Sequence, residues 1–513
     1  VTVSSSIANG TVTANKTAAG IGDTVVVTEA PAEGYELRSL TYTPEGGTAT
    51  TIEAVNGIYN FIMPAANVTI NATYAHPYVW DGTADTSWYS DSETSFTITT
   101  PEELAGFADL VNKQGKTFAG KTVTLANDLY LNESAAPVNA NWVVDTTGQN
   151  LWTPIASAEI GTGFANARIF NGTFDGGGHT IYNMCCVLNI SSGYSGLFGF
   201  MDRGAVVKNL GVTGVSQGRI AGGICASFGS GGSGSLPLIE NCYNACTVRG
   251  DGSGTRGTGG ILGGQKGAGG TVLNCYNTGT IHNTYRPAGG VVGVTTSEKV
   301  INCYNTGSVT SASGTGFAGA VVGTLNSGSM SNCLWLDGTA NWACSYPSSA
   351  TGATKLSSGD LKLAAATLGS AYVADSDTSS VNNGYPVLYW QAGLSEVSME
   401  DVSATDIASV TYTGSAQTPT SALTCRLDGG DYTLKAGTDY TVAYSNNVNA
   451  GSAKVTFTGL GRFTGELVKT FDITGVDLSG CTIDAVADQP FAGEAVKPAL
   501  TVKNGSTTLV EGT

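Results

Sequence analysis

The stretch FDGGGHTIY contains the two residues best suited to acid–base chemistry, Asp175 and His179. A carboxylate beside an imidazole could move protons near neutral pH, because histidine titrates in that range. The interpretation we favour is that Asp175 and the glycines form a turn, while His179 makes a structural hydrogen bond. The chain has three histidines and no HExxH motif, so the sequence argues against a zinc metallopeptidase of that class.

Carboxylates that could cleave glycosidic bonds are scarce in the centre of the chain. Glycosidases need paired carboxylates, and lyases need a basic residue beside a metal-bound uronate. Between positions 238 and 336 the acidic residues are Glu240, Asp251 and Glu298, which form no close pair in the sequence. We therefore predict a non-catalytic chain and keep a carbohydrate-active β-helix enzyme, a polysaccharide lyase or a glycosidase, as the alternative.

We expect neither a metal nor a cofactor. In the segment DGTADTSWYSDSE, Asp81 and Asp85 are weak candidates for calcium ligands, but the segment lacks the spacing of an EF-hand loop. The favoured interpretation is a solvated loop with Trp80 and Trp88 packed beneath it.

The eleven cysteines do not show the paired pattern of a disulfide framework. Four of them, Cys242, Cys275, Cys303 and Cys333, occur once per repeat of the motif described below. We expect these four to be small buried hydrophobic residues. A local Cys333–Cys344 bridge is the less favoured alternative, and the sequence does not fix the oxidation state.

The net charge of −17 over 513 residues argues against a nucleic-acid partner, which would need clustered Lys and Arg. No stretch reaches the roughly 18 apolar residues of a membrane helix, so we expect no membrane insertion. Glycine is abundant, at 71 residues, and only 12% of residues are charged. This composition indicates a β-rich, turn-rich surface protein, which we interpret as a fragment of a longer secreted chain trimmed at both ends.

A six-residue motif recurs about every thirty positions and predicts the main architecture. NCYNTG stands at 274–279 and 302–307, with related copies NCYNAC at 241–246 and NCLWLD at 332–337. Glycine–apolar steps such as GGILG, GGVVG and GAVVG accompany the motif, with Ile261, Val291 and Val321 thirty residues apart. Repeats of this length without helical patterns predict a right-handed parallel β-helix, a solenoid of stacked coils. The fold class is therefore mainly β.

Stacked coils bring equivalent residues together about 4.8 Å apart, so the motif predicts ladders. Asparagine tolerates the left-handed backbone of a bend and can bond to its own kind. We therefore expect one column of asparagines, comprising Asn241, Asn274, Asn302 and Asn332. If that asparagine makes a bend, the following cysteine points inward and the tyrosine points outward. If the strand instead continues without a bend, the alternation of its side chains points the tyrosine inward and the cysteine outward. The sequence leaves this choice open.

An outward column of Tyr243, Tyr276 and Tyr304 is the best candidate for a ligand-binding face. Tyrosine is enriched at interfaces, so the ligand would be an extracellular glycan or protein. The favoured alternative is that these rings pack beneath side loops of the coils.

Two helices are expected at the borders of the solenoid. The segment TPEELAGFADLVNKQG has Thr100 placed as the cap, Pro101 at the first position and Glu103 completing a capping box. A second helix is expected in SSGDLKLAAATLG, starting after Ser357 and ending at Gly369.

Four segments are predicted along the chain. Residues 1–75 form a small β repeat, 76–392 the β-helix with short capping helices, and 393–474 a β-sandwich. Residues 475–513 begin a second copy of the sandwich, because FAGEAVKP at 491–498 matches YTGSAQTP at 412–419. Half a sandwich cannot close its own core, so we expect this last segment to be incomplete.

Several segments resemble modules of bacterial surface proteins. GDTVVVTEAPAEGYE and FIMPAANVTINATY resemble the repeat related to the internalin B-repeat. The NCYNTG repeats, IFNGTFDGGGHTIYNM and NNGYPVLYWQ resemble the GLUG motif, which also occurs in non-catalytic parts of IgA-protease-like proteins. Residues 393–474 resemble tandem bacterial Ig-like repeats of Gram-positive bacteria. These resemblances imply a cell-wall-attached or secreted adhesin that displays a rigid solenoid.

Overall fold

The computed structural model describes the chain apart from positions 33, 56, 77–78, 158–167, 191, 230–233, 252–255, 265–268, 286, 313, 376–379, 476 and 510–513. It divides into two compact units, Val1–Leu356 and Ser357–Thr513. The fold is mainly β, as predicted, and its centre is a parallel β-solenoid of about seven coils. No helix in the described part of the chain is long and apolar enough to cross a bilayer.

The N-terminal segment contains two four-stranded sheets around one small core. Its apolar residues alternate along the strands, so that Val25, Val27 and Ile70 are almost fully buried. One sheet has the order β1 (Thr2–Val3), β8 (Val68–Ala75), β4 (Glu36–Pro44) and β5 (Thr50–Thr51). The other has the order β2 (Gly10–Ala14), β3 (Thr24–Pro31), β7 (Ile58–Ile62) and β6 (Ala54–Val55).

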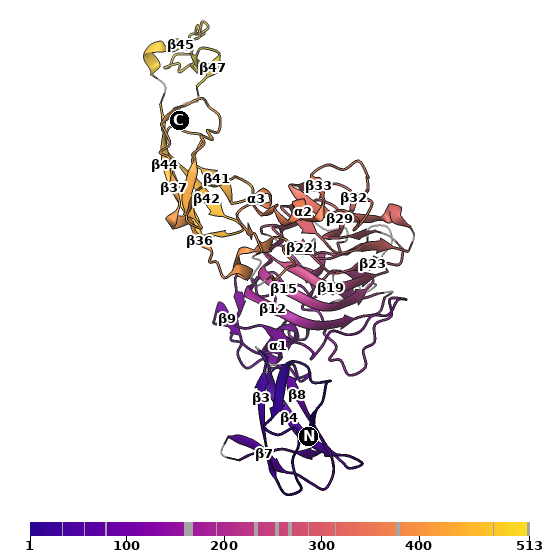
Figure 1. Ribbon diagram of the computed structural model, residues 1–513. Coiled ribbons are helices and arrows are strands. Elements are labelled where there is room, and N and C mark those ends of the chain that lie inside the picture. Colours follow the sequence, from indigo (N-terminus) through magenta and orange to yellow (C-terminus); the bar gives the residue numbers. More distant parts are fainter. Residues whose placement is uncertain are drawn as a thin grey trace. The chain divides into compact units, whose positions relative to one another are not determined.

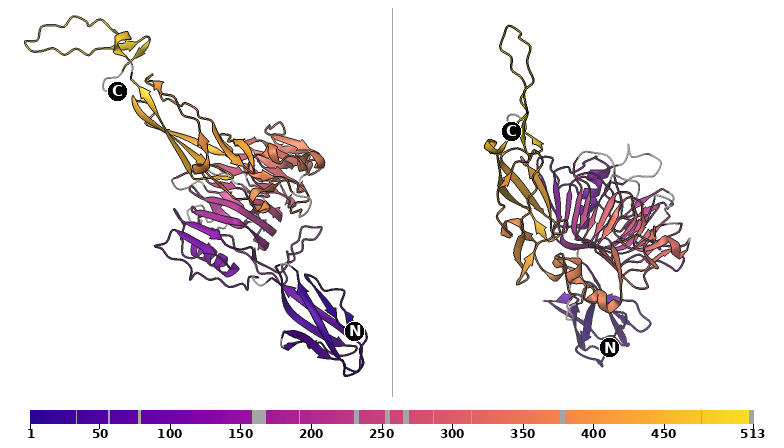
Figure 2. Two further views of the ribbon diagram at one scale, coloured as in Figure 1. Left: turned by 60° about the vertical axis from the view of Figure 1, so that its left-hand side comes forward. Right: turned by 90° about the horizontal axis from the view of Figure 1, so that it is seen from above.

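The solenoid consists of parallel strands stacked coil upon coil, as Figure 1 and Figure 2 show. The first column contains β9 (Ser95–Ile98), β10 (Thr122–Leu125), β12 (Thr173–Val187), β15 (Val206–Gly218), β18 (Leu238–Glu240), β21 (Gly270–Leu273), β26 (Glu298–Ile301) and β30 (Ser329–Ser331). The parallel pairing confirms the predicted stacking of the repeats.

The second column follows the NCYN motif. It contains β11 (Leu129–Tyr130), the later parts of β12 and β15, β19 (Tyr243–Gly250), β22 (Tyr276–Asn277), β27 (Tyr304–Asn305), β31 (Cys333–Leu336) and β33 (Ala353–Leu356). The far end of β19 continues into a short stack of β23 (Ile281–Asn283) and β28 (Val309–Ser311).

The third column follows the glycine–apolar steps. It contains β13 (Tyr194–Ser195), β16 (Ile220–Ala221), β20 (Thr258–Gly259), β24 (Ala288–Gly289), β29 (Ala318–Leu325) and β32 (Trp342–Tyr346), with β14 (Phe198–Met201), β17 (Cys225–Phe228) and β25 (Val292–Thr295) beside them. A short 3₁₀ helix, η2 (Thr315–Phe317), precedes β29. The glycines are required here because neighbouring backbone comes too close for a side chain: a Cβ on Gly289 would lie 2.5 Å from Gly323 N.

The predicted first helix is present as α1 (Pro101–Asn112), with the capping box of Thr100 and Glu103. Its face at Leu104, Phe107 and Val111 is buried in the solenoid core. The second helix differs from the expectation. It is split into α2 (Ser358–Lys362), capped by Ser357, and α3 (Ala365–Leu368), because the backbone at Leu363 and Ala364 leaves the helical region.

The second unit begins before the predicted boundary. The coil stacking ends with β33, so the division falls after Leu356, whereas the sequence placed it after residue 392. The unit contains the pair β34 (Tyr372–Val373) and β35 (Val387–Leu388), the 3₁₀ helices η3 (Tyr389–Ala392) and η4 (Met399–Asp401), and the pair β36 (Val397–Ser398) and β43 (Phe463–Thr464).

Two further sheets of this unit share a core that includes Leu423, Val455 and Phe457. They are β37 (Ser403–Ala404), β39 (Leu423–Leu427) and β40 (Gly430–Thr433), and β38 (Val410–Thr411), β44 (Glu466–Thr474), β42 (Gly451–Gly459) and β41 (Tyr440–Ser445).

The last segment has η5 (Leu478–Gly480) and a small sheet of β45 (Thr482–Ile483), β46 (Val502–Asn504) and β47 (Thr507–Thr508). Phe491 is 96% exposed, and none of the described side chains from 477 to 509 is buried.

Candidate functional site

The first asparagine of each NCYN motif lies in one column of coil-to-coil hydrogen bonds. Asn241, Asn274, Asn302 and Asn332 all have φ near +50°, the left-handed backbone of a bend. Their side-chain amides bond in series: Asn274 Nδ2 donates to Asn241 Oδ1 (3.2 Å), Asn302 to Asn274 (3.0 Å) and Asn332 to Asn302 (2.8 Å). The column extends one coil further, where Asn241 Nδ2 donates to Asn209 Oδ1 (3.1 Å).

The second asparagine of the motif forms another ladder, which the sequence analysis missed. Asn244 Nδ2 donates to Asn277 Oδ1, and Asn277 Nδ2 donates to Asn305 Oδ1, both across 2.7 Å. All three side chains are 0% exposed. Asn277 and Asn305 also donate to the carbonyls of Gly279 and Gly307 (2.8 Å). The asparagine that follows each NCY was the available signal.

The cysteine column lies in the solenoid core. Cys242, Cys275, Cys303 and Cys333 are 0–1% exposed and belong to the main apolar cluster. Burial raises the pKa of the thiols of Cys275, Cys303 and Cys333 well above its usual value, so they stay protonated and unreactive. All eleven cysteines of the chain are described and all are free, so the alternative Cys333–Cys344 bridge is not formed.

The tyrosine column is stacked but does not form an exposed face. The Tyr243 and Tyr276 rings are 5.2 Å apart and the Tyr276 and Tyr304 rings 4.9 Å apart, in near-parallel stacks. Tyr276 is 2% exposed and Tyr304 0%, while Tyr243 is half-buried. This corrects the expectation of an outward binding column, since stacking covers the ring faces and the edges are also removed from solvent. In the two NCYNTG coils both the cysteine and the tyrosine are therefore buried.

Asp175 and His179 do not pair with each other. His179 Nδ1 lies 3.3 Å from Asp128 Oδ1, whereas Asp175 Oδ2 lies 3.2 Å from Lys208 Nζ. Asp175 Oδ1 also accepts from Gly177 N (2.9 Å), a residue with φ of +61°. The glycines differ from the expected turn, because they lie within β12, where its register against β15 shifts between Asp175 and His179.

A nucleophile-elbow pattern, GVSQG at 214–218, is another candidate for chemistry that the sequence analysis missed. Its serine, Ser216, lies within β15 and is 0% exposed. The Ser216 hydroxyl donates to the Gly222 carbonyl (2.8 Å). An elbow serine must stand exposed at a strand-to-helix turn, so this one is structural.

The acidic residues of the repeats are not assembled into a catalytic pair. Glu298 is 1% exposed and accepts from the backbone amides of Thr296 and Ser297. Glu240 is 9% exposed and lies at the end of β18. Asp251 follows β19. Glu240 and Asp251 thus lie on one coil, separated by the whole length of β19, and Glu298 lies on another coil.

Asp81 and Asp85 close local turns. Asp81 Oδ1 accepts from Thr83 N (2.8 Å) and Thr83 Oγ1 (2.6 Å), and Asp85 Oδ1 accepts from Ser87 N (2.8 Å). Those hydrogen bonds lower the pKa of both carboxyls. Within the described residues, no group of three or more His, Cys, Asp or Glu side chains is placed to hold a metal ion.

Comparison with known proteins gives a structural alignment and a family match to the N-terminal segment. A solved structure from Bacteroides ovatus, described as a "putative immunoglobulin A1 protease", aligns with 59% of this chain and 94% of its own, at 20% identity and a TM-score of 0.39. No curated protein matches the chain. Residues 1–77 match the family model of the divergent InlB B-repeat domain, which confirms the internalin-type resemblance of the N-terminal segment.

Proposed function

We propose that this chain is a non-catalytic part of an extracellular adhesin, whose solenoid presents a surface to a glycan or protein ligand. In this proposal the solenoid repeats are GLUG motifs, and the sheets of residues 393–474 are a bacterial Ig-like module followed by the start of another. The protein would be secreted by, or attached to the wall of, a Gram-positive bacterium. The B-repeat match at residues 1–77 supports a surface location.

The observation that carries the proposal is the way the solenoid uses its repeated polar side chains. The asparagines of each motif bond to the same residue of the next coil, and the cysteines are buried in the core. Groups engaged in this way stabilise a stack and are not available to a substrate. The repeated side chains therefore stabilise the solenoid, and ligand binding is left to its outer surface.

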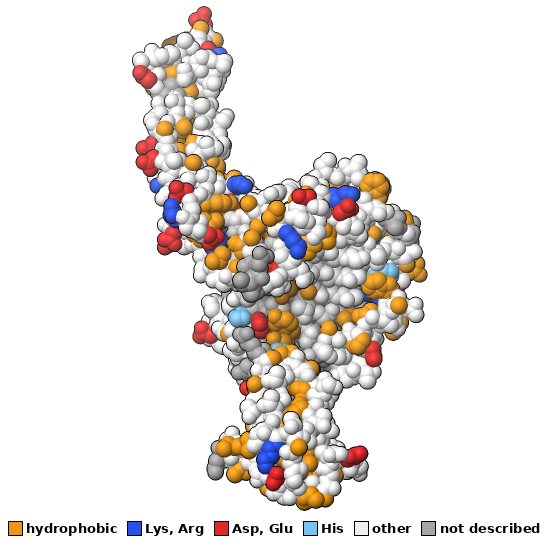
Figure 3. All heavy atoms as spheres, in the orientation of Figure 1, with side chains coloured by type: hydrophobic (Ala, Val, Ile, Leu, Met, Phe, Trp, Pro, Cys, Tyr) orange, Lys and Arg blue, Asp and Glu red, His pale blue; other side chains and the backbone are white. Residues whose placement is uncertain are grey.

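The outer surface supports recognition of uncharged groups. On the face drawn in Figure 3, most of the surface is backbone and side chains that are neither hydrophobic nor charged, and basic side chains are sparse. Over the whole chain 23 Lys and Arg stand against 40 Asp and Glu. Such a surface disfavours polyanions, including nucleic acids, and suits hydroxyl-rich or protein ligands.

A binding experiment with the intact 513-residue chain tests the proposal. The chain would be applied to a glycan array and to a panel of immobilised extracellular-matrix proteins, with parallel assays for release of reducing ends and of unsaturated uronates. We expect saturable binding to at least one surface without release of product. Turnover of any bound polysaccharide would overturn the proposal in favour of a lyase or glycosidase, and absence of binding on both surfaces would overturn it outright.

A further inference from the structure

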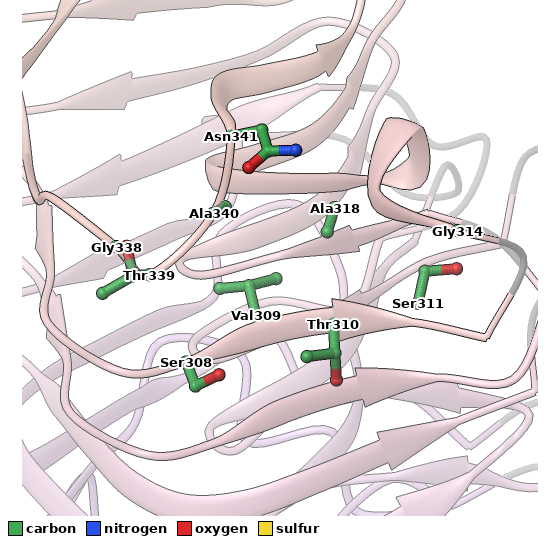
Figure 4. Close-up of a pocket in the computed structure, with 10 residues that line it drawn as sticks. All are labelled: Ser308, Val309, Thr310, Ser311, Gly314, Ala318, Gly338, Thr339, Ala340 and Asn341. Atoms are coloured by element: carbon green, nitrogen blue, oxygen red, sulfur yellow. The ribbon is translucent and has the colours of Figure 1, made fainter.

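An open cavity of about 280 Å³ lies where the regular coil stacking is interrupted. On one side β28 pairs with β23, and on its other side the next coil forms a turn at 337–341 in place of a strand. One backbone bond remains there, from Val309 N to Thr339 O (3.0 Å). The missing strand leaves the cavity between β28, the start of β29 and the turn, as Figure 4 shows.

The lining of this cavity is amphiphilic and uncharged. Figure 4 shows the small apolar side chains of Val309, Ala318 and Ala340 in the middle of the lining. Hydroxyl and amide groups from Ser308, Ser311 and Asn341 lie around them. No Asp, Glu, Lys, Arg or His is among the described residues of the lining.

The strand that forms one wall is held in place from its outer face. Thr310 Oγ1 lies 2.9 Å from His282 Nδ1 on β23, and the His282 ring stacks on the Trp142 ring at 4.1 Å. Arg249 on β19 donates to the Trp142 carbonyl (2.6 Å). This bond connects the segment around Trp142 to the coil of β19, which precedes the coil of β23. A wall fixed in this way lowers the ordering cost of binding.

We propose that this cavity binds one neutral sugar residue of a glycan. It lies just below the roughly 300–1,000 Å³ of pockets that enclose drug-sized ligands, so it suits a single ring. The C–H face of a pyranose fits the apolar middle, and its hydroxyls meet the Ser308, Ser311 and Asn341 groups. Acidic sugars are disfavoured, because no cation in the described lining compensates a buried charge. This inference deepens the proposed function by naming a ligand class, and rests on it.

Saturation-transfer NMR with the whole chain tests the pocket directly. The probes are free glucose, galactose, mannose and N-acetylglucosamine, with glucuronate as the charged comparator. We expect at least one neutral sugar to bind in the millimolar range and glucuronate to bind more weakly. Absence of transfer to every neutral sugar, or stronger binding of glucuronate, overturns the proposal.

Two variants locate the binding. A340L fills the middle of the lining and should abolish transfer, whereas A353L enlarges another partly buried alanine on β33, outside the lining, and should not. N341A removes one hydrogen-bonding amide and should weaken binding about three- to tenfold. N504A, which changes an exposed amide in the second unit, should leave binding unaltered. Unchanged affinity in both A340L and N341A overturns the assignment even if A340L is folded less well.

The outcomes separate this inference from the proposed function. If the chain binds array glycans and A340L binds them equally, the pocket assignment is wrong and the adhesin proposal stands. If free sugar binds and A340L abolishes that binding, but no array or protein surface is recognised, the pocket assignment stands and the adhesin proposal is wrong. Binding of an extended peptide along the open edge of β28 in place of a sugar would also overturn the pocket assignment.

Discussion

The side-chain amides of Asn277 and Asn305 are joined by a hydrogen bond of 2.7 Å between residues 28 positions apart in the chain. Both side chains are 0% exposed, and each is the second asparagine of its own NCYN motif. A buried amide is costly when unpaired and stabilising when paired, so a ladder of amides couples the coils. The ladder fixes register between coils as well as adding stability.

Asn277→Ala should therefore destabilise the solenoid strongly. It removes the 2.7 Å bond from Asn244 Nδ2, which keeps only a longer bond to Cys246 O (3.4 Å), and the 2.7 Å bond to Asn305 Oδ1, which still accepts from Gly307 N (3.1 Å). We expect a loss of about 2–4 kcal/mol in the free energy of unfolding, measured by chemical denaturation. N504A, at an exposed amide, is the matched control and should change stability by less than about 0.5 kcal/mol. An equal effect of the two variants would contradict the role of the ladder.

The sequence was sufficient to predict the solenoid, because its signals are local and repeated. One geometry, a stack of parallel coils, explains the thirty-residue spacing, the Asn at each bend and the glycine–apolar steps. The capping box at Thr100 and Glu103 is equally local, and α1 begins where it predicts. The length of the second helix was overestimated, because no sequence signal marks the break at Leu363 and Ala364.

The proposed binding surface could not be predicted in the same way. Burial of Tyr276 and Tyr304 depends on what surrounds the column, which the period of a strand does not report. The cavity beside β28 arises from an irregular coil, DGTAN at 337–341, whose residues look like any other turn in the sequence. Departures from the repeat therefore had to be found in the structure.

The thiols should differ sharply in reactivity. Cys425 and Cys481 are partly exposed and the other nine cysteines are buried. Burial raises the pKa of Cys186 and Cys225 to about 12, so almost none of these two thiols is ionised in the native protein at pH 8. With a chromogenic aromatic disulfide we expect Cys481 to react first, Cys425 next, and the rest only in denaturant. Fast native labelling of Cys275 or Cys303, detected by peptide mass spectrometry, would contradict the buried column.

Gly289, the first glycine of the GGVVG step, should tolerate no side chain. A Cβ on Gly289 would meet Val292 O and Gly323 N at distances that real Cβ atoms do not adopt, and both contacts are backbone. We expect Gly289→Ala to cost about 3 kcal/mol or more, measured by thermal and denaturant unfolding. Gly316→Ala in η2 is the control, because nothing lies within 4 Å of its Cβ position. That variant should be neutral or slightly stabilising, and equal losses would show that the close approach is not limiting.

His282 should make the solenoid less stable in mild acid. Burial, with the nearby Arg249 charge, lowers the pKa of His282 from 6.5 to about 4. The unfolded chain thus binds a proton at this residue below about pH 6.5, while the folded protein does not until about pH 4. The stability that depends on neutral His282 is complete above pH 6.5 and falls by about 1–3 kcal/mol as the pH drops to 4.

The comparison of wild type with His282→Gln at pH 7, 5 and 4 isolates this contribution. Hydrogen exchange at the Ile281 amide, which donates to Ser308 O (2.8 Å) just before β28, reports the local stability. We expect the wild-type protection to decline between pH 7 and 4 more steeply than that of H282Q, after correction for intrinsic exchange. Because Trp142 stacks on His282, its fluorescence should change over the same pH range in the wild type alone. Parallel pH profiles for the two proteins would mean that His282 is protonated as readily in the fold as in the unfolded chain.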